Sequence, residues 1–78
     1  MIVPDDDYAQ LGRALAAIRR RSGLTQAEVA QKVGVRNTHI SGIETGERGA
    51  SYPTILAMLR VYDSTLGELA EEIERGGG

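Results

Sequence analysis

The segment from Thr25 to Gly46 constrains the fold of this chain more than any other, because two short helical patterns meet there across a single turn. Thr25 and Glu28 have the spacing of a capping box, in which each side chain satisfies a backbone N–H at the start of a helix. Gly34 ends the first pattern and can adopt the positive φ that turns the chain sharply into a second helix. The segment therefore predicts a helix-turn-helix unit over residues 25–46.

The second helix of this unit is expected to begin near Arg36 or Asn37 and to end at Gly46. One side of it is apolar at helical spacing. The other side has no large apolar group and no acid, whereas a helix face exposed only to water normally carries Glu and Lys. Small polar groups there can approach a second surface closely and still form hydrogen bonds. The inward residues are Val35, Ile40 and Ile43 with Glu44 at their edge, and the outward ones are Thr38, Ser41, Gly42 and Thr45.

Three more amphipathic patterns surround this unit, and no strand pattern occurs in the sequence. The first follows a cap at Asp7 and ends at Gly23, and the other two follow caps at Ser51 and Thr65. The sequence therefore predicts an all-α protein, a compact bundle of five helices with an aliphatic core. The expected stripes of these three helices are Tyr8, Leu11, Leu15 and Ile18, then Ile55, Leu56, Leu59 and Tyr62, then Leu66, Leu69 and Ile73.

The 78 residues suffice for one domain, which the patterns place at residues 8–75. Residues 1–7 are expected to form a flexible acidic arm, and residues 76–78 a disordered glycine tail. Within the domain, residues 25–46 are the helix-turn-helix unit and residues 52–75 complete the core. A chain this short leaves apolar residues uncovered, so the last two helices are also expected to form a dimer interface.

The net charge is −2, but the charges are unevenly distributed. Arg13 to Arg48 holds seven bases and three acids, which gives +4, whereas Asp63 to Arg75 holds five acids and one base, which gives −4. The positive stretch contains the helix-turn-helix unit, which favours a nucleic-acid partner. Because its charge is modest, we expect few phosphate contacts and weak non-specific binding. The acids of the last helix that are expected to face water are Glu71, Glu72 and Glu74.

Several functional classes find no support in the composition. The chain has no cysteine, which excludes disulfides and thiolate metal sites. No apolar run approaches the roughly 20 residues of a membrane span, and no signal segment opens the sequence, so a cytoplasmic protein without a membrane partner is expected. The single histidine, His39, has no nucleophile at a suitable spacing. We therefore predict no catalytic residue, no metal and no cofactor.

This pattern resembles the helix-turn-helix of the phage-repressor (Cro/XRE-like) family from about Leu11 to Ile73. The resemblance implies a five-helix domain of the phage-repressor type, with the helix-turn-helix formed by helices two and three. It also implies a transcriptional regulator, most often a repressor or autoregulator, that binds an inverted-repeat operator on double-stranded DNA as a homodimer through the major groove. The matching residues are Leu24-Thr25-Gln26, Ala30, Gly34, Ile40-Ser41, Ile43-Glu44 and Gly46.

Base contacts are assigned to the outward face of the third helix. Asn37, Thr38 and Gly42 match positions from which family members commonly touch bases, and Ser41 shares their face. Asn37 can pair with adenine N6 and N7, and Thr38 can touch a thymine methyl; the alternative for both is a helix start that faces only water. Gly42 costs up to ~1 kcal/mol against alanine in a helix interior. It also removes a side chain that often reads a base, so we expect fewer base contacts than usual.

Phosphate contacts are assigned to the ends of the two helices. Gln26 matches a residue that grips a phosphate and braces the reading helix, and the backbone amides near Thr25 can hold a phosphate on the helix dipole. Arg19 and Glu44 match a frequent internal ion pair between the first and third helices. The remaining candidates for phosphate contacts are Arg36, His39 and Arg48.

Some basic residues allow two interpretations. Arg36 stands where the family generally has a Ser or Thr cap. Either Asn37 caps the helix one residue late, or the cap is lost and Arg36 reaches the DNA backbone. Arg20 and Arg21 either face a phosphate or complement the dipole at the end of the first helix. His39 either donates to a phosphate or is an exposed histidine without a role.

Three biological settings fit this prediction: a stand-alone repressor, a controller protein of a restriction–modification system, and an antitoxin-type autoregulator. The run Ile-Ser-Gly-Ile-Glu at 40–44 is often seen in controller proteins. A toxin or RNA polymerase is a further candidate partner. The competing class is a protein-interaction module that keeps the fold without binding DNA. Salt separates the two classes, because only DNA binding weakens steeply with salt in proportion to its phosphate contacts.

Overall fold

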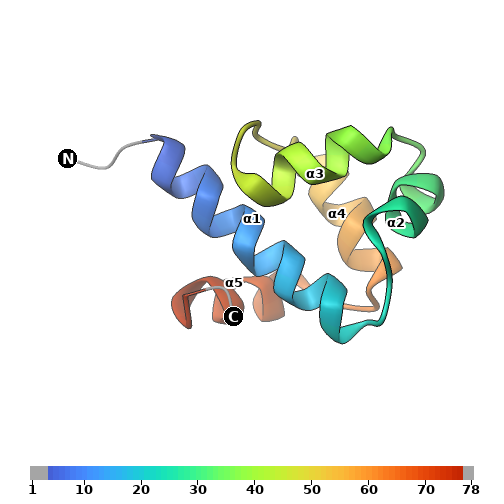
Figure 1. Cartoon of the computed structure of the whole chain (residues 1–78). Coiled ribbons are helices and arrows are strands. Elements are labelled where there is room, and N and C mark those ends of the chain that lie inside the picture. The colour runs from blue at the N-terminus through green and yellow to red at the C-terminus, as the bar shows by residue number, and fades with distance from the viewer. Residues whose placement is uncertain (1–3, 77–78) are drawn as a thin grey trace.

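Five helices follow one another along the residues that the structure, a computed structural model, describes, which are residues 4–76 (Figure 1). Among these residues there is no strand, so the predicted all-α class is confirmed. α1 runs diagonally across the molecule, with α3 on one side and α5 on the other (Figure 1). The helices are α1 (Pro4–Arg21), α2 (Gln26–Val33), α3 (Asn37–Thr45), α4 (Tyr52–Val61) and α5 (Leu66–Glu74).

The N-caps of α2, α4 and α5 lie where the sequence predicts them, at Thr25, Ser51 and Thr65. At the start of α2, Thr25 Oγ1 accepts from the N–H of Glu28 at 3.1 Å, and the N–H of Thr25 donates to Glu28 Oε1 at 2.9 Å. α5 begins with the same capping box, built by Thr65 and Glu68. Gly34 takes φ 88°, which closes the turn between α2 and α3. These local signals define the helix-turn-helix unit as predicted.

Both ends of the domain differ from the prediction. α1 begins at Pro4, so Asp7 lies inside the helix and is not its N-cap. Proline suits a first turn because its missing N–H would have no partner there. At the other end, Gly76 takes φ 90° and its N–H donates to the carbonyl of Ile73 at 3.0 Å. The hydrogen-bonded turn that closes α5 therefore reaches Gly76, which was expected to belong to the tail. The remaining parts of the predicted arm and tail, residues 1–3 and 77–78, lie outside the described residues.

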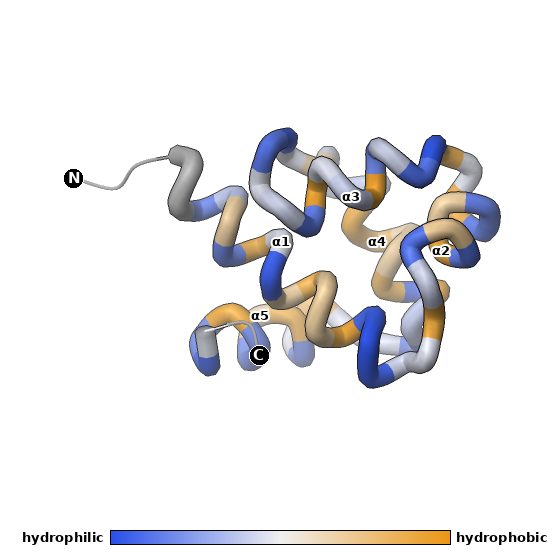
Figure 2. The backbone as a smooth tube through the Cα atoms, in the orientation of Figure 1, coloured by the Kyte–Doolittle hydropathy of each residue, from blue (hydrophilic) through white to orange (hydrophobic). Residues whose placement is uncertain are grey.

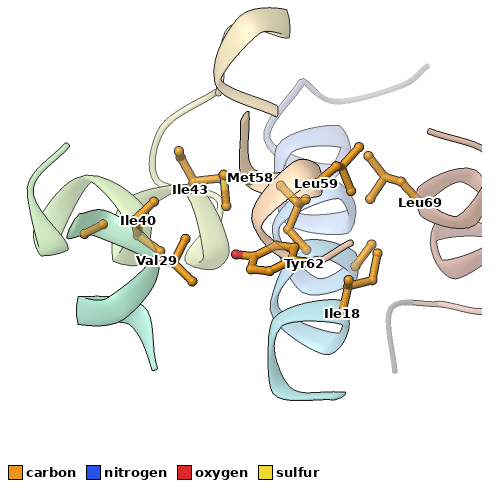
Figure 3. Close-up of a cluster of buried hydrophobic side chains, with 11 residues drawn as sticks. Ile18, Val29, Ile40, Ile43, Met58, Leu59, Tyr62 and Leu69 are labelled. Carbon is orange, nitrogen blue, oxygen red and sulfur yellow. The ribbon is translucent and has the colours of Figure 1, made fainter. Parts of the chain in front are cut away.

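The core draws residues from all five helices (Figure 3). Figure 2 shows hydrophobic residues along α4, which lies behind α2 and α3 in that view. The predicted stripes are confirmed except at three residues, since Tyr8 is 44% exposed, Leu66 is 43% exposed, and the half-buried Leu56 does not pack against the core. The buried alanines of α1 were not predicted, because alanine carries little periodic signal. The buried hydrophobic residues are Ala14, Leu15, Ala16, Ala17, Ile18, Val29, Ala30, Ile40, Ile43, Met58, Leu59, Tyr62 and Leu69.

α1 and α3 approach each other closely where Gly12 faces the end of α3. A Cβ added at Gly12 would collide with the carbonyl oxygens of Ile43 and Glu44. One added at Gly46 would lie 2.8 Å from the Cα of Ala9. Glycine at both positions therefore lets the two backbones touch. As a result, α1 contacts the inward side of α3 and the residues at the end of α3.

An ion pair joins α1 to α5, and the sequence did not predict it. Arg21 Nη2 lies 2.6 Å from Glu72 Oε1, and the Glu72 side chain is only 2% exposed. The expectation that Glu72 faces water is therefore wrong. The Arg21 side chain remains 57% exposed, so the pair lies at the surface with the arginine covering the carboxylate. Of the two interpretations for Arg21, the phosphate-facing one is disfavoured because its guanidinium pairs with Glu72, whereas its place in the last turn of α1 fits the complement to the helix dipole.

Candidate nucleic-acid interface

α3 presents a polar outward face, as the sequence predicts. Asn37 and Thr38 are exposed, whereas His39 and Ser41 are half-buried. On the inward side Ile40 and Ile43 are buried, and Glu44 is buried with them at 8% exposure. Figure 1 shows α3 along the edge of the molecule opposite α5, with its outward side uncovered by other helices. The structure therefore leaves the predicted base-reading residues accessible to a large partner.

Glu44 holds α1, α2 and α3 together through three hydrogen bonds. Its Oε2 accepts from Arg19 Nε at 2.7 Å, and its Oε1 accepts from Arg19 Nη2 at 3.1 Å and from Gln26 Nε2 at 2.8 Å. Arg19 also donates from Nη1 to the carbonyl of Leu24 at 2.9 Å. The hydrogen bond to Glu44 raises the pKa of Arg19, against the opposing effect of burial. The predicted Arg19–Glu44 ion pair is confirmed, and we call Arg19, Gln26 and Glu44 the α3 brace.

Gln26 was expected both to brace α3 and to bind a phosphate, and the structure shows the bracing contact. Its amide nitrogen carries two N–H donors, and one of them is used by Glu44. The second donor remains for another acceptor, and the residue is half-buried at the start of α2. Fixed by the brace, this amide has little rotational freedom left to lose when it binds a phosphate oxygen. The phosphate contact of Gln26 stays a prediction, and the brace makes it geometrically specific.

The start of α3 has no side-chain cap. Arg36 occupies the N-cap position with φ −78° and ψ 152°, and its side chain makes no capping hydrogen bond. Asn37 is the first residue of the helix and does not act as a late cap. The first N–H groups of an α-helix have no partner inside the helix. The side-chain cap is therefore lost, as the second of the two interpretations expects, and the contact of the exposed Arg36 side chain with the DNA backbone stays a prediction.

The loop after α3 folds back on the helix at Gly42. The N–H of Arg48 donates to the carbonyl of Gly42 at 3.2 Å, and the hydroxyl of Thr45 donates to the same oxygen at 3.2 Å. A Cβ added at Gly42 would lie 3.0 Å from Cδ and 3.1 Å from Cγ of Arg48. The aliphatic stem of Arg48 therefore lies over Gly42. The sequence gives no sign of this contact, because the loop has no periodic pattern.

A basic groove, lined in part by the α3 brace itself, lies between α1, the start of α2 and the end of α3. Arg13 and Arg20 are exposed and line it with Gln26 and Thr45. Arg20 thus keeps its phosphate-facing interpretation, whereas Arg21 does not. Among the described residues there is no group of three or more His, Cys, Asp or Glu side chains placed to hold a metal. None of the described helices is long and apolar enough to cross a membrane.

Comparison with known proteins agrees with this geometry. A helix-turn-helix domain family matches residues 10–73. The chain is 33% identical over 70 residues to the HTH-type transcriptional regulator PuuR of Escherichia coli K12, which covers 90% of this chain and 38% of PuuR. It is 33% identical over 57 residues to the antitoxin HipB of E. coli O6:H1, which covers 73% of this chain and 61% of HipB. The chain therefore spans less than two thirds of the length of both relatives, 38% of PuuR and 61% of HipB.

Among solved structures, the restriction–modification controller protein C.AhdI of Aeromonas hydrophila superposes with a TM-score of 0.77 at 30% identity. The match covers 82% of this chain and 97% of C.AhdI. The aligned region in all these proteins contains the helix-turn-helix unit described above. The chain belongs to the helix-turn-helix domain family, as a DNA-binding domain of the Cro/XRE-like type found in transcriptional regulators.

Proposed function

We propose that this protein binds a two-fold DNA operator as a homodimer and represses transcription by occupying it, in the cytoplasm and without catalysis. The observation that carries the proposal is the placement of α3. Its inward side is fixed by the α3 brace and by the close contact at Gly12, while Asn37 and Thr38 project freely. A helix whose inward face is fixed by the rest of the domain and whose outward face is polar suits insertion into the major groove, which is wide enough to admit one helix.

The contacts divide into two sets. Asn37, Thr38 and Ser41 face the base edges, where an amide can pair with adenine and a hydroxyl with several bases. The phosphates on either side meet donors at the ends of α2 and α3. These donors are the second N–H of Gln26, the amides near Thr25, the side chains of Arg36, His39 and Arg48, and the exposed Arg20 of the basic groove.

The dimer sets two copies of α3 into successive turns of one DNA face. Half-sites then lie about 34 Å or ~10 bp apart, as in other helix-turn-helix dimers. Each half-site is bound by few cations, so cooperation between two copies supplies the affinity that one domain lacks. We place the dimer interface on α4 and α5, where Tyr52 and Leu66 are among the exposed large hydrophobic residues.

Of the three regulatory settings, the controller protein has the strongest support. C.AhdI is described as a restriction–modification controller protein, and its chain is matched over 97% of its length. The match to HipB, an antitoxin, covers 61% of that protein, which keeps a toxin as a second candidate partner. A protein that controls its own operon needs only the operator and its own concentration as a signal.

The experiment that tests this function is a binding selection from random duplex DNA at ~100 mM salt, which suppresses electrostatic sticking. We expect an inverted repeat with half-sites about one turn apart. Selections with Asn37→Ala and Thr38→Ala should relax the preference at separate positions by about 1–3 kcal/mol each, whereas Gln26→Ala should weaken binding to all sequences alike. Gln31→Ala, an exposed amide of α2 outside these contacts, is the matched control.

Two outcomes would contradict the proposal. A folded, dimeric protein that enriches no sequence, and whose binding to a protein partner is insensitive to salt, would favour the interaction module. A single enriched half-site with a 1:1 complex would retain DNA binding and remove the dimer. Analytical ultracentrifugation of the protein with and without the selected duplex distinguishes these results.

A further inference from the structure

Gly42 and Arg48 act as one structural unit on the outward face of α3. Gly42 lies 40° around the helix from Thr38 at 100° per residue, so both point to the same side. Gly42 itself offers no side chain there. The stem of Arg48 takes the space that a side chain at this position would fill, because a Cβ on Gly42 would lie 3.0 Å from Arg48 Cδ. The loop therefore places the long cationic side chain of Arg48 at the position where Gly42 leaves the helix without a side chain.

The position of Arg48 is held by its backbone as well as by this contact. Its N–H donates to the Gly42 carbonyl at 3.2 Å, and the hydroxyl of Thr45 donates to the same oxygen. The two side-chain ion pairs found among the described residues join Arg19 to Glu44 and Arg21 to Glu72, and Arg48 takes part in neither. Its side chain is exposed. The guanidinium is thus carried on an anchored stem, and among the described side chains no ion pair engages it.

We propose that Arg48 reads a base edge in the major groove, in place of the side chain that Gly42 lacks. A guanidinium offers parallel N–H donors that match O6 and N7 of guanine, and this is the commonest specific contact between a side chain and a base. Arg48 therefore specifies a guanine at one position of each half-site, next to the position that Thr38 contacts. This inference rests on the proposed function, and it replaces the phosphate contact expected for Arg48 by a base contact.

The two roles of Arg48 differ in what its removal changes. A base-reading arginine changes the preference at one position, whereas a phosphate-binding arginine weakens binding to all sequences and lowers the salt slope by about one unit. We expect Arg48→Ala to reduce the preference for guanine at one position by about 5- to 150-fold, the range of one bidentate pair. The preferences at the positions assigned to Asn37 and Thr38 should remain.

Gly42→Ala tests the same contact without changing the charge. The added Cβ forces the Arg48 stem to move, because the two carbons would be 3.0 Å apart. We expect a smaller loss of the same guanine preference, and no further loss when Gly42→Ala is added to Arg48→Ala. The alanine also favours the helix, so a change in specificity cannot be attributed to unfolding.

The experiment is a parallel selection from random duplexes with the wild type, both single variants and the double variant, followed by titrations at several salt concentrations. An unchanged guanine preference in Arg48→Ala, together with a salt slope lowered by about one unit, overturns the inference and leaves the proposed function intact. A Gly42→Ala effect that persists without Arg48 also overturns it. If the wild type enriches no sequence, the proposed function fails and this inference fails with it.

Discussion

Removing the carboxylate of Glu44 is the change that best tests how the fold presents α3. Glu44→Ala deletes three hydrogen bonds that connect α3 to α1 and α2. Arg19 would keep only its bond to the Leu24 carbonyl, with a side chain that is 13% exposed. Breaking a buried ion pair by removing one partner costs roughly 3–5 kcal/mol. The partly exposed edge of Arg19 lets water recover some of this cost.

The expected loss for Glu44→Ala is therefore about 2–4 kcal/mol, including the weaker loss at Gln26, whose neutral amide can bond to water. Because ~1 kcal/mol shifts the melting temperature of a domain of this size by about 4–8 °C, the midpoint should fall by roughly 10–30 °C. Thermal and urea unfolding followed by circular dichroism measure both quantities. Glu71→Ala, an exposed acid of α5, is the control and should stay within about 0.5 kcal/mol of the wild type.

A double-mutant cycle with Arg19→Ala isolates the pair itself. Residues in direct contact typically show coupling of about 0.5–3 kcal/mol, so the double variant should be more stable than the two single losses predict. A Glu44→Ala protein that unfolds within about 0.5 kcal/mol of the wild type would refute the α3 brace as a stabilising element. Strict additivity in the cycle would refute the coupling between Arg19 and Glu44.

Two further changes probe the ionisable groups outside the brace. The Tyr62 hydroxyl is buried, has no hydrogen-bond partner among the described residues, and has its pKa raised mainly by burial. Tyr62→Phe should therefore stabilise the fold by up to ~1 kcal/mol, because it removes this unsatisfied group. A lower free energy of unfolding in urea would contradict this. The pKa of Glu72 is lowered from 4.5, chiefly by Arg21, so its contribution is present above pH 4.5 and lost as the pH falls through the lower folded pKa. Glu72→Gln should flatten this acid limb of the unfolding free energy, and an unchanged limb would exclude the pair as its source.

The sequence predicted the parts of this protein that depend on neighbours along the chain. Capping boxes at Thr25 and Thr65 and the glycine at 34 act within a few residues, so their spacing is sufficient to place helix ends. Periodicity likewise separates the inward and outward faces of α3. The start of α1 was placed at Asp7 instead of Pro4, because an acid that could cap and an acid inside a first turn look alike in sequence.

The candidate site was predicted in part. The Arg19–Glu44 pair was expected from the family resemblance and is present, and Gln26 joins it. Periodicity alone would have left Glu44 at the edge of the apolar face, because it does not specify which partner satisfies a buried charge. The DNA contacts of Asn37, Thr38, Ser41 and the phosphate-binding candidates remain predictions.

What the chain order could not specify is the set of contacts between residues far apart in sequence. Glu72 is buried because α5 docks where Arg21 can cover it, and Leu66, the first residue of α5, is exposed although it shares a helix face with the packed Ile73. The contact of Arg48 with Gly42 depends on a loop path without any periodic signal. Helix type and helix ends follow from local hydrogen bonds and steric limits, whereas burial and partner choice follow from how the five helices pack, and that packing determines which charges are left to meet a partner.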